Sequence, residues 1–550
     1  MKKLLAMILS LALLLGLAAC AGAPGSGETT PPCLEEETVQ PTEETPVGEV
    51  TLTGIPASAR ADKGNALVFY EIFVGSFSDS DGDGIGDLQG IIQRFDYLND
   101  GDPDSGLSLG VEGIWLSPIF TSPSYHKYDV ADYYQVDPKF GTEEDLKELI
   151  ELCHERGVKL ILDLVINHTS SSHPWFRSFV DAHKSGDTAS EYYDFYSWSD
   201  SSLTNRTMTA FGGTGHYYEC NFSTQMPELN YDNPAVRQCM VDVAKYYLDL
   251  GVDGFRFDAA KYIYYGETTP NLEFWNWYMG ELRAIKADIY TVAEVWDADG
   301  LVIPYHSATN CFNFTMSQVS GLLAKSAQNG NVNGLTAYVA DYLEKIQAEN
   351  PDAMMVSFLA NHDTDRAAGY LPVSNGRAKV AANLNLLMPG SPFIYYGEEI
   401  GMTGSRGSAN TDANRRLAMN WGDGDTVRDP EGANYAAGQP NGTVEEQLAR
   451  EDSLYNHYKK LIMIRNACPE IACGTYTPLK TSGKVGAFLS TWNDSTVAVL
   501  HNASPDAVTV DLAKLTDVPL KTLFAWAGVG GATLEGTVLT IDGQTSVVLK

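Results

Sequence analysis

From about residue 66 onward, the chain alternates between strand-like and helix-like patterns of apolar residues. LVFYEIFVGSF (67–77) and VKLILDLVINH (158–168) are continuous apolar runs, typical of strands that are buried on both faces. TEEDLKELIELCHERG (142–157) instead spaces its apolar residues three and four apart, begins with a capping threonine and ends in glycine. The pattern therefore predicts a buried parallel sheet that is covered by amphipathic helices.

Eight segments have the strand pattern, and helical patterns lie between them. They are residues 67–77, 111–120, 158–168, 251–260, 290–296, 311–317, 354–363 and 392–401. Eight repeats of strand and helix are typical of one α/β architecture, in which the sheet closes on itself. We therefore predict an α/β fold, a (β/α)8 TIM barrel.

Two segments depart from this rhythm. More than 60 residues separate His168 from the next helical pattern at 234, and they are rich in Ser, Tyr, Gly and Asp. We predict an inserted domain here, residues 169–228, after the third strand. Beyond residue 468 short alternating strands replace the helical pattern, which predicts a C-terminal antiparallel β-sandwich domain over 469–550. The barrel then comprises residues 63–168 and 229–468.

The N-terminus reads as a secretory signal rather than as part of the fold. Two lysines precede an apolar run in MKKLLAMILSLALLLGLAAC (1–20), which is short for a membrane span. Its last four residues resemble the bacterial lipobox, which implies cleavage before Cys20 and lipidation of its sulfur; the alternative is an ordinary signal peptide with a chance cysteine. Residues 21–62 are acidic and rich in Pro, as expected of a disordered tether. We expect an extracytoplasmic lipoprotein on the bacterial cell membrane.

Composition narrows the possible partners. The formal net charge of −34 argues against nucleic acid, whose binding needs a basic surface, and is compatible with neutral sugars. A monomer is expected. Seven cysteines remain after Cys20, without the spacing of a zinc site. Cys468 and Cys473 are a candidate pair, and most of the others are expected to be buried as small apolar residues.

The stretch SFSDSDGDGIGDLQG (76–90) has the front half of a calcium-binding loop. Aspartates occupy alternate positions, as in an EF-hand, but Gly90 stands where the closing Glu belongs and a strand precedes the loop. Four carboxylates so close together repel one another without a cation. We predict a structural Ca²⁺ site, the alternative being an acidic surface turn. The expected ligands are Asp79, Asp81, Asp83, the carbonyl of Ile85, and Asp87.

Charged residues gather at the carboxyl ends of the predicted strands, where TIM barrels carry their chemistry. Arg256 and Asp258 are two residues apart, so they share one face of their strand. A lone acid or histidine at a strand end is usually a cap or a solvated group, but the whole set predicts an active site. Its members are Asp163, Asn167, His168, Arg256, Asp258, Lys261, Glu294, Trp296, His362 and Asp363.

Four of these strand ends resemble, in order, the signature regions of the α-amylase family, glycoside hydrolase family 13. They are DLVINH (163–168), GFRFDAAKY (254–262), EVW (294–296) and FLANHD (358–363). MPELN (226–230) resembles the fifth region and YHKYDVADY (125–133) the second-strand loop. The aspartate-rich loop is similar to that of oligo-1,6-glucosidase-like members. The resemblance covers residues 65–550 and implies a bacterial lipoprotein α-amylase close to the oligo-1,6-glucosidase and neopullulanase-like members.

The resemblance also implies roles for single residues. Asp258 takes the position of the nucleophile, Glu294 that of the acid/base, and Asp363 that of the group that stabilises the transition state. Arg256 should keep Asp258 ionised, and Lys261 should face the leaving group. The substrate-binding residues that the resemblance implies are His126, Tyr128, Asp163, His168, Arg256, Lys261 and His362.

Two departures from the family pattern bear on specificity. Glu228 stands where the fifth region usually has Asp, and Tyr125 stands where the exo-acting relatives usually have Asp. The pattern YHKYD (125–129) looks like that of endo-acting amylases and neopullulanases. The resemblance as a whole implies a retaining hydrolase of α-1,4 bonds in starch and maltooligosaccharides, acting through a covalent glycosyl-enzyme, and we expect it to be endo-acting. The alternatives are a neopullulanase or cyclomaltodextrinase, an oligo-1,6-glucosidase, a 4-α-glucanotransferase, or a non-catalytic glucan-binding protein.

The lipobox yields a direct prediction. Cys20→Ser should release the protein from the membrane fraction without changing its specific activity, because two acyl chains on one cysteine supply the anchoring. Fractionation of cells that express the wild type or the variant measures this. A processed variant that remains in the membrane fraction would contradict the lipid anchor.

Overall fold

The computed structural model describes residues 62–550, except 104, 409, 423 and 482. The predicted signal peptide, Cys20 and nearly all of the predicted tether lie outside the described residues, and the predictions made for them stay predictions. Within the described part of the chain, no helix is long and apolar enough to cross a membrane.

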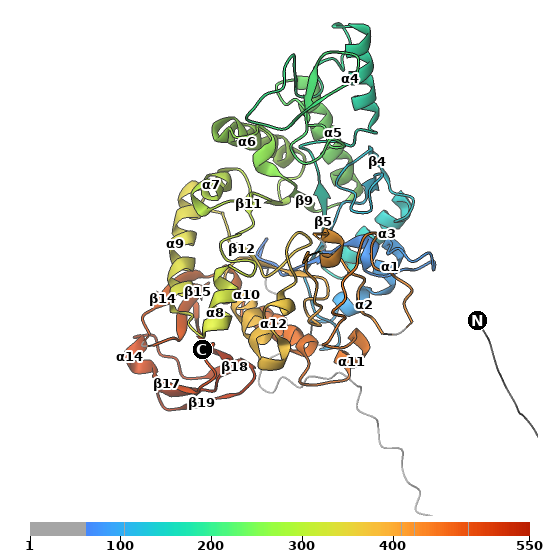
Figure 1. Cartoon of the computed structure of the whole chain (residues 1–550). Coiled ribbons are helices and arrows are strands. Elements are labelled where there is room, and N and C mark those ends of the chain that lie inside the picture. The colour runs from blue at the N-terminus through green and yellow to red at the C-terminus, as the bar shows by residue number, and fades with distance from the viewer. Residues whose placement is uncertain (1–61, 104, 409, 423, 482) are drawn as a thin grey trace, which may run out of the picture. The chain divides into compact units, whose positions relative to one another are not determined.

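Eight parallel strands form a nearly closed barrel (Figure 1), in the order β11-β10-β9-β5-β2-β1-β13-β12. A parallel bridge between Phe312 and Val356 brings the two ends of this sheet together. The predicted (β/α)8 fold is confirmed. The strands are β1 (Phe69–Ile72), β2 (Gly113–Leu116), β5 (Lys159–Leu164), β9 (Gly254–Phe257), β10 (Tyr290–Ala293), β11 (Asn310–Cys311), β12 (Val356–Phe358) and β13 (Ser391–Tyr395).

The helices form where the sequence supplies caps and an apolar stripe. In α3, Thr142 and Asp145 make a reciprocal capping box, and the predicted stripe is buried. The other helices of the barrel are α1 (Leu88–Gln93), α2 (Phe95–Leu98), α5 (Pro234–Leu250), α6 (Thr268–Ile285), α7 (Asp299–Val302), α8 (Leu322–Asn329), α9 (Asn333–Glu349), α10 (Arg377–Leu386), α11 (Val444–Leu448), α12 (Leu454–Ala467) and α13 (Pro469–Cys473); α3 itself spans Glu143–Glu155.

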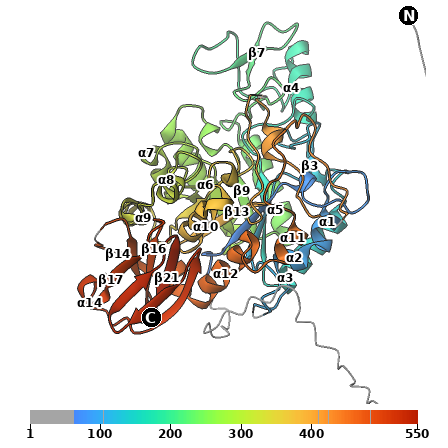
Figure 2. The same ribbon diagram turned by 60° about the horizontal axis from the view of Figure 1, so that its bottom comes forward.

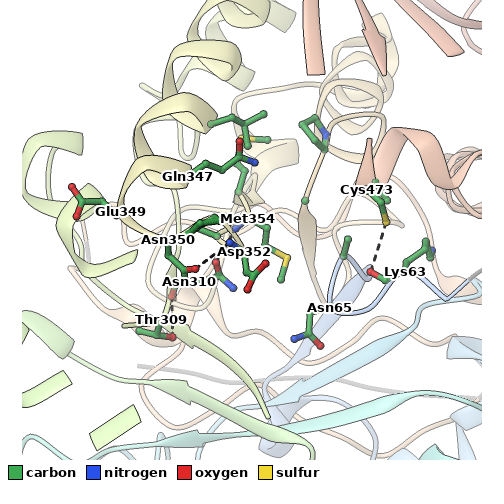
Figure 3. Close-up of a pocket in the computed structure, with 18 of the residues that line it drawn as sticks. Lys63, Asn65, Thr309, Asn310, Gln347, Glu349, Asn350, Asp352, Met354 and Cys473 are labelled. Carbon is green, nitrogen blue, oxygen red and sulfur yellow. Dashed lines mark hydrogen bonds between the residues drawn. The ribbon is translucent and has the colours of Figure 1, made fainter. Parts of the chain in front are cut away.

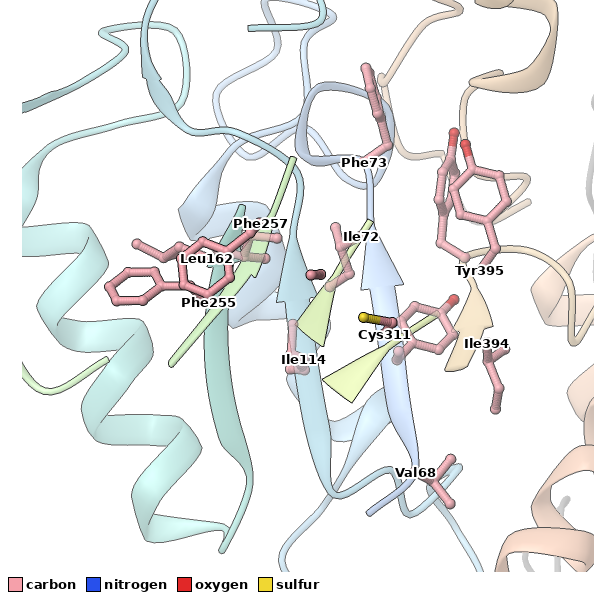
Figure 4. Packing of buried hydrophobic residues seen from close by; sticks show 14 of the residues in the cluster. Val68, Ile72, Phe73, Ile114, Leu162, Phe255, Phe257, Cys311, Ile394 and Tyr395 are labelled. Atoms are coloured by element: carbon pink, nitrogen blue, oxygen red, sulfur yellow. The ribbon is translucent and has the colours of Figure 1, made fainter. Parts of the chain in front are cut away.

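Alternate residues of each strand face opposite sides of the barrel wall. Ile114 and Phe255 point outward against the helices, in the cluster shown in Figure 4. Phe69 and Trp115 belong to a separate inner cluster that fills the barrel. Gly113 allows this packing, because a Cβ there would come within 2.4 Å of the Phe69 ring. The barrel interior is therefore a packed apolar core below the charged strand ends.

The inserted domain after β5 contains a small sheet in the order β6-β8-β7 and one helix. Helix α4 was not anticipated, although its buried residues have helical spacing, His173 caps it, and Gly186 ends it in a left-handed conformation. The elements are α4 (Pro174–Ser185), β6 (Trp198–Ser199), β7 (Met208–Ala210) and β8 (Tyr217–Glu219). A hairpin of β3 (Phe120–Thr121) and β4 (Asp132–Val136) follows β2.

The C-terminal strands form two antiparallel sheets (Figure 2), as predicted, in the orders β14-β15-β16-β21-β18 and β17-β20-β19. A buried cluster with members from both sheets lies between them. Cys468 and Cys473, at the two ends of α13, are both free, so the candidate disulfide is not formed. The exact domain limits stay predictions. The elements are β14 (Thr475–Leu479), β15 (Gly486–Trp492), β16 (Ser495–Asn502), β17 (Val508–Asp511), α14 (Leu512–Leu515), β18 (Leu523–Gly528), β19 (Ala532–Glu535), β20 (Val538–Ile541) and β21 (Thr545–Leu549).

Candidate active site

Charged side chains converge at the carboxyl ends of β5, β9, β10 and β12. Asp163 lies within β5 and Arg256 within β9, while Asp258 and Glu294 directly follow β9 and β10. Asp363 lies in the loop after β12. This is the end of a barrel at which loops can shape a substrate site.

Arg256 is the centre of this group. Its guanidinium is fully buried, and Nη1 donates to Asp163 Oδ1 at 2.9 Å and to Asp258 Oδ1 at 2.7 Å. Its Nη2 forms an ion pair with Glu294 Oε2 at 3.0 Å. The Trp115 ring lies 5.1 Å from the guanidinium carbon. One cation thus holds three carboxylates at once, two of which are the candidate nucleophile and acid/base.

Burial raises the pKa of both candidate catalytic carboxyls. It raises the pKa of Glu294 to about 7 and that of Asp258 to about 6, and in both cases Arg256 opposes this rise. The expected effect of Arg256 on Asp258 is therefore present but smaller than the effect of burial. A carboxyl whose pKa is raised toward neutrality can hold a proton as a general acid, and the Arg256 guanidinium favours the ionised form that a nucleophile requires.

Asp363 is held by two cationic groups. His362 Nε2 lies 3.0 Å from Asp363 Oδ2, and Arg416 Nη2 lies 2.7 Å from Asp363 Oδ1. Burial would raise the pKa of Asp363, but these neighbours lower it below its ordinary value. His362 is in turn bound through Nδ1 to Glu71 Oε1 at 2.6 Å. Although burial lowers the pKa of His362, Asp363 and Glu71 raise it to about 10, so the ring is an imidazolium at neutral pH.

Aromatic and neutral imidazole groups complete the mouth. The Tyr128 hydroxyl donates to Asp163 Oδ2 at 2.8 Å, and its ring stacks on His362 with centroids 5.2 Å apart. His168 Nε2 lies 3.2 Å from the Tyr128 carbonyl oxygen. Burial lowers the pKa of His168 and of His126 to about 4, so both rings are neutral and are able to donate and accept hydrogen bonds with hydroxyls.

On the other side of the mouth, Lys261 is held in place by the loop after β10. Its Nζ donates to the Trp296 carbonyl at 2.7 Å and to Asp297 Oδ2 at 3.0 Å. The Trp296 ring is 40% exposed and stacks on Phe314.

Glu228 pairs with the His168 backbone in an isolated bridge, and burial raises its pKa to about 8.

Two residues of the site were missed by reasoning from the sequence. Glu71 is a lone acid inside an apolar strand, which was a signal that could have been read. Arg416 lies in the long loop after β13, where a basic residue carries no such signal. Its Nε donates to the His362 carbonyl at 3.1 Å and its Nη1 to the Tyr125 hydroxyl at 3.1 Å.

The structure brings three of the predicted calcium ligands close together. Carboxylate oxygens of Asp79, Asp81 and Asp87 lie within 4.8 Å of one another. Asp83 is outside this group, and its Oδ1 accepts from the Ile85 backbone N–H at 2.7 Å. A set of carboxylate oxygens is the donor set that Ca²⁺ prefers, so the residues present fit the predicted ion.

A large cavity, of about 1190 Å³, lies at the opposite end of the barrel (Figure 3). It is lined by residues that precede or begin the strands, among them Asn65, Thr309, Asn310 and Met354, and by residues near the start of the C-terminal domain. None of the converging carboxylates lines it. The position of the titratable groups, rather than cavity size, therefore marks the candidate active site.

Comparison with known proteins assigns this geometry to a family. The family model described as "Alpha amylase, catalytic domain" matches residues 71–474. The chain belongs to the α-amylase family. It is therefore an enzyme related to glycoside hydrolases and transferases that act on α-glucans, as its strand-end motifs indicated.

Curated relatives within the family differ in activity. Alpha-amylase 3 of Dictyoglomus thermophilum is 38% identical over 79% of this chain and 84% of its own length. The 4-alpha-glucanotransferase of Thermotoga maritima is 32% identical over 63% of this chain and 74% of its own. The oligo-1,6-glucosidase of Parageobacillus thermoglucosidasius is 32% identical over 74% and 84%.

The solved structures agree with the family assignment. Amy13B of Eubacterium rectale superimposes with a TM-score of 0.82 and 35% identity, covering 89% of this chain and 96% of that chain. The similarity extends beyond the matched catalytic region, so the C-terminal sheets are part of the shared architecture.

Removing either central carboxyl should abolish most turnover. Glu294→Gln should lower kcat by about 10²–10⁴-fold, because it removes general acid/base catalysis, and Asp258→Asn should cost at least as much. Glu445→Gln, an exposed change on α11, is the matched control. Initial rates on a maltooligosaccharide, with melting temperatures to verify folding, measure this. Near-normal turnover in a folded Asp258 or Glu294 variant would reject the assignment.

The pH profile of kcat/KM should be bell-shaped. Activity should fall below about pH 6, where Asp258 gains a proton, and again above about pH 7, where Glu294 loses its proton. Rates measured across the range in which the melting temperature is unchanged test this. An activity that keeps rising above neutral pH would contradict the roles given to the two carboxyls.

Proposed function

We propose that the protein is a retaining, endo-acting α-glucan hydrolase that cleaves α-1,4 bonds of starch and maltooligosaccharides. The observation that carries this proposal is the pair of carboxyls on one buried guanidinium, with Asp258 Oδ1 at 2.7 Å and Glu294 Oε2 at 3.0 Å from Arg256. Two carboxyls of unequal proton affinity on either side of a bond are what glycoside cleavage requires.

The steps follow from this arrangement. Glu294 gives its proton to the glycosidic oxygen while Asp258 attacks the anomeric carbon, so the glycosyl–oxygen bond breaks and a glycosyl-enzyme forms. Glu294, now a carboxylate, takes a proton from the incoming water, which displaces Asp258 and restores both groups. Asp363, fixed by His362 and Arg416, presents an ionised carboxylate to the sugar hydroxyls.

The endo mode is supported by the residue at position 125. An exo-enzyme needs polar groups that grip a free chain end, and an acid supplies this in the exo-acting relatives. Here the position is a tyrosine whose hydroxyl accepts from Arg416. A phenol packed in this way offers a surface along which a chain can continue, without requiring an end.

A second candidate is 4-α-glucanotransferase activity, which one relative of known function has. Transfer needs the same glycosyl-enzyme and differs only in that a sugar hydroxyl replaces water. The exposed Trp296 and Phe222, on the side of Lys261, favour an acceptor sugar because they offer apolar faces for stacking. Product analysis separates the two, since transfer forms chains longer than the substrate.

The endo proposal predicts the order in which products appear. Starch–iodine colour and viscosity should fall well before most reducing sugar is released, because internal cuts shorten chains quickly. A substrate blocked at its non-reducing end should be cleaved at nearly the normal rate. Glucose as the sole early product, together with inert blocked substrates, would show that the enzyme is an exo-glucosidase.

We also propose that the loop of Asp79, Asp81 and Asp87 binds calcium and that the ion is structural. The loop precedes α1. It is also hydrogen-bonded to a segment far away in the sequence, because the Thr426 hydroxyl donates to Asp79 Oδ2 at 2.6 Å. The N-terminal lipobox supports the further proposal that the enzyme acts outside the cytoplasm, where calcium is available.

Chelation should lower the melting temperature, and added calcium should restore it, because an ion that binds only the folded state stabilises that state by mass action. Asp81→Asn should abolish the response, whereas the exposed Asp517→Asn should retain it. Differential scanning fluorimetry with calcium titration measures this. A wild-type melting curve that is indifferent to chelator and calcium would reject the site.

A further inference from the structure

The residue that follows the candidate nucleophile has an unusual backbone conformation. Ala259 has φ 48° and ψ 38°, in the left-handed region that residues other than glycine rarely occupy, and it is buried. Such a conformation persists only where the surrounding structure fixes it, and it is often found at functional sites. The contacts of Ala259 therefore indicate what this conformation does.

Neighbouring elements hold the turn at Ala259 in place. The Ala260 N–H donates to the Glu294 carbonyl at 3.0 Å, which joins the segment after β9 to the end of β10. The buried Trp275 ring of α6 donates through Nε1 to the Ala260 carbonyl at 2.8 Å. Within the turn, the Tyr262 N–H donates to the Ala259 carbonyl at 2.9 Å. The left-handed conformation is therefore imposed from two sides and cannot relax without breaking these bonds.

This conformation directs one backbone N–H at the candidate acid. The Ala259 N–H donates to Glu294 Oε2 at 3.0 Å, and the same oxygen lies 3.0 Å from Arg256 Nη2. Within the described part of the chain, Glu294 Oε1 has no hydrogen-bond or ion-pair partner, and the side chain is 11% exposed. The two oxygens of the acid are therefore unequal, because one faces two donors and the other is free.

The inequality determines which oxygen can carry the acidic proton. A proton on Oε2 would compete with two donors for the same lone pairs, whereas a proton on Oε1 has no competitor. When Oε1 gives its proton to the glycosidic oxygen, the electron pair of the O–H bond stays on Glu294. The negative charge is then shared with Oε2, where the N–H and the guanidinium stabilise it. The glycosidic oxygen gains the proton as the electron pair of its bond to the anomeric carbon moves onto it.

We propose that Ala259 is a positioning residue for the general acid. Its left-handed backbone holds the N–H at Glu294 Oε2, so that the proton for the leaving group is carried by Oε1. The inference rests on the proposed function, because it concerns the acid of that reaction. It extends that function by assigning the proton to one oxygen and by giving a role to a residue without a reactive side chain.

A β-branched residue at position 259 tests the proposal, because such residues are strongly disfavoured at positive φ. Ala259→Val should lower kcat/KM for release of glucose from the reducing end of maltotetraose by about tenfold or more, as part of the roughly 10²–10⁴-fold that general acid catalysis contributes. Release of nitrophenol from 4-nitrophenyl α-maltotrioside should fall by less than about threefold, because a nitrophenolate needs little protonation to leave. Ala337→Val, at an exposed position of α9, is the matched control and should change neither rate.

The pH profile supplies a second readout, which a merely structural role would not move. The N–H stabilises the ionised form of Glu294, so its loss raises the pKa of this carboxyl, and the alkaline limb of kcat/KM should move to higher pH. The substitution leaves the other charged and titratable groups around Glu294 in the chain, namely Arg256, Asp258, Tyr262 and Asp363. In Ala259→Gly the alkaline limb should stay where the wild type has it, because glycine adopts the left-handed conformation freely.

An amide-to-ester replacement at position 259, with lactic acid in place of alanine, deletes the N–H without changing the side chain. It tests the same contact if the valine variant does not fold, and it should reproduce both the leaving-group dependence and the alkaline shift. An equal loss on the two substrates, an alkaline limb that stays in place, or full activity on maltotetraose without the N–H would each overturn the inference while leaving the hydrolase intact. A wild type that cleaves neither substrate would instead refute the proposed function.

Discussion

The rest of this structure depends on one buried ion-pair network, in which the Arg256 guanidinium contacts three carboxylates. Arg256 is completely removed from water, and a lone charge in that position would be very unfavourable. Asp163, Asp258 and Glu294 compensate it at 2.7–3.0 Å, and they come from three neighbouring strands of the barrel. The strands must therefore be held in fixed register, since a slip by one residue would turn Arg256 out of the barrel and bring a phenylalanine in.

Along the barrel axis, the residues that stabilise the fold and the residues that carry the chemistry lie at different levels. The lower interior is filled by large side chains such as Phe69 and Phe393, whose rings carry no polar atom that needs a partner. The charged groups lie next to this apolar layer, and the Trp115 ring packs against the Arg256 guanidinium. The apolar layer excludes water from below, which raises the pKa values of both central carboxyls.

Reasoning from the sequence reached the fold and the residues at strand ends, because both depend on local patterns. The alternation in GFRFD places Arg256 and Asp258 on one face, and the cap and stripe of α3 are equally local. Glu71 and Arg416 could not be placed, because their partners at His362 and Asp363 become neighbours only when the barrel closes. Burial, which sets the pKa values, is likewise a property of the closed barrel. The predicted pairing of Cys468 and Cys473 was wrong for the opposite reason. The two residues are close in sequence, but the helix between them does not bring their thiols together.

The attachment of the inserted domain has a consequence for how this chain tolerates change. Its two connections run side by side, with the Leu229 N–H donating to the Asn167 carbonyl and the Thr169 N–H to the Pro227 carbonyl. The ends of the insertion are thus already together in the barrel, so its length and sequence can drift without straining the strands on either side. Such a module can also open as one cooperative unit while the barrel stays closed. Native-state hydrogen exchange would detect this as a shared opening free energy for α4 and its sheet, below that of β5 and β9.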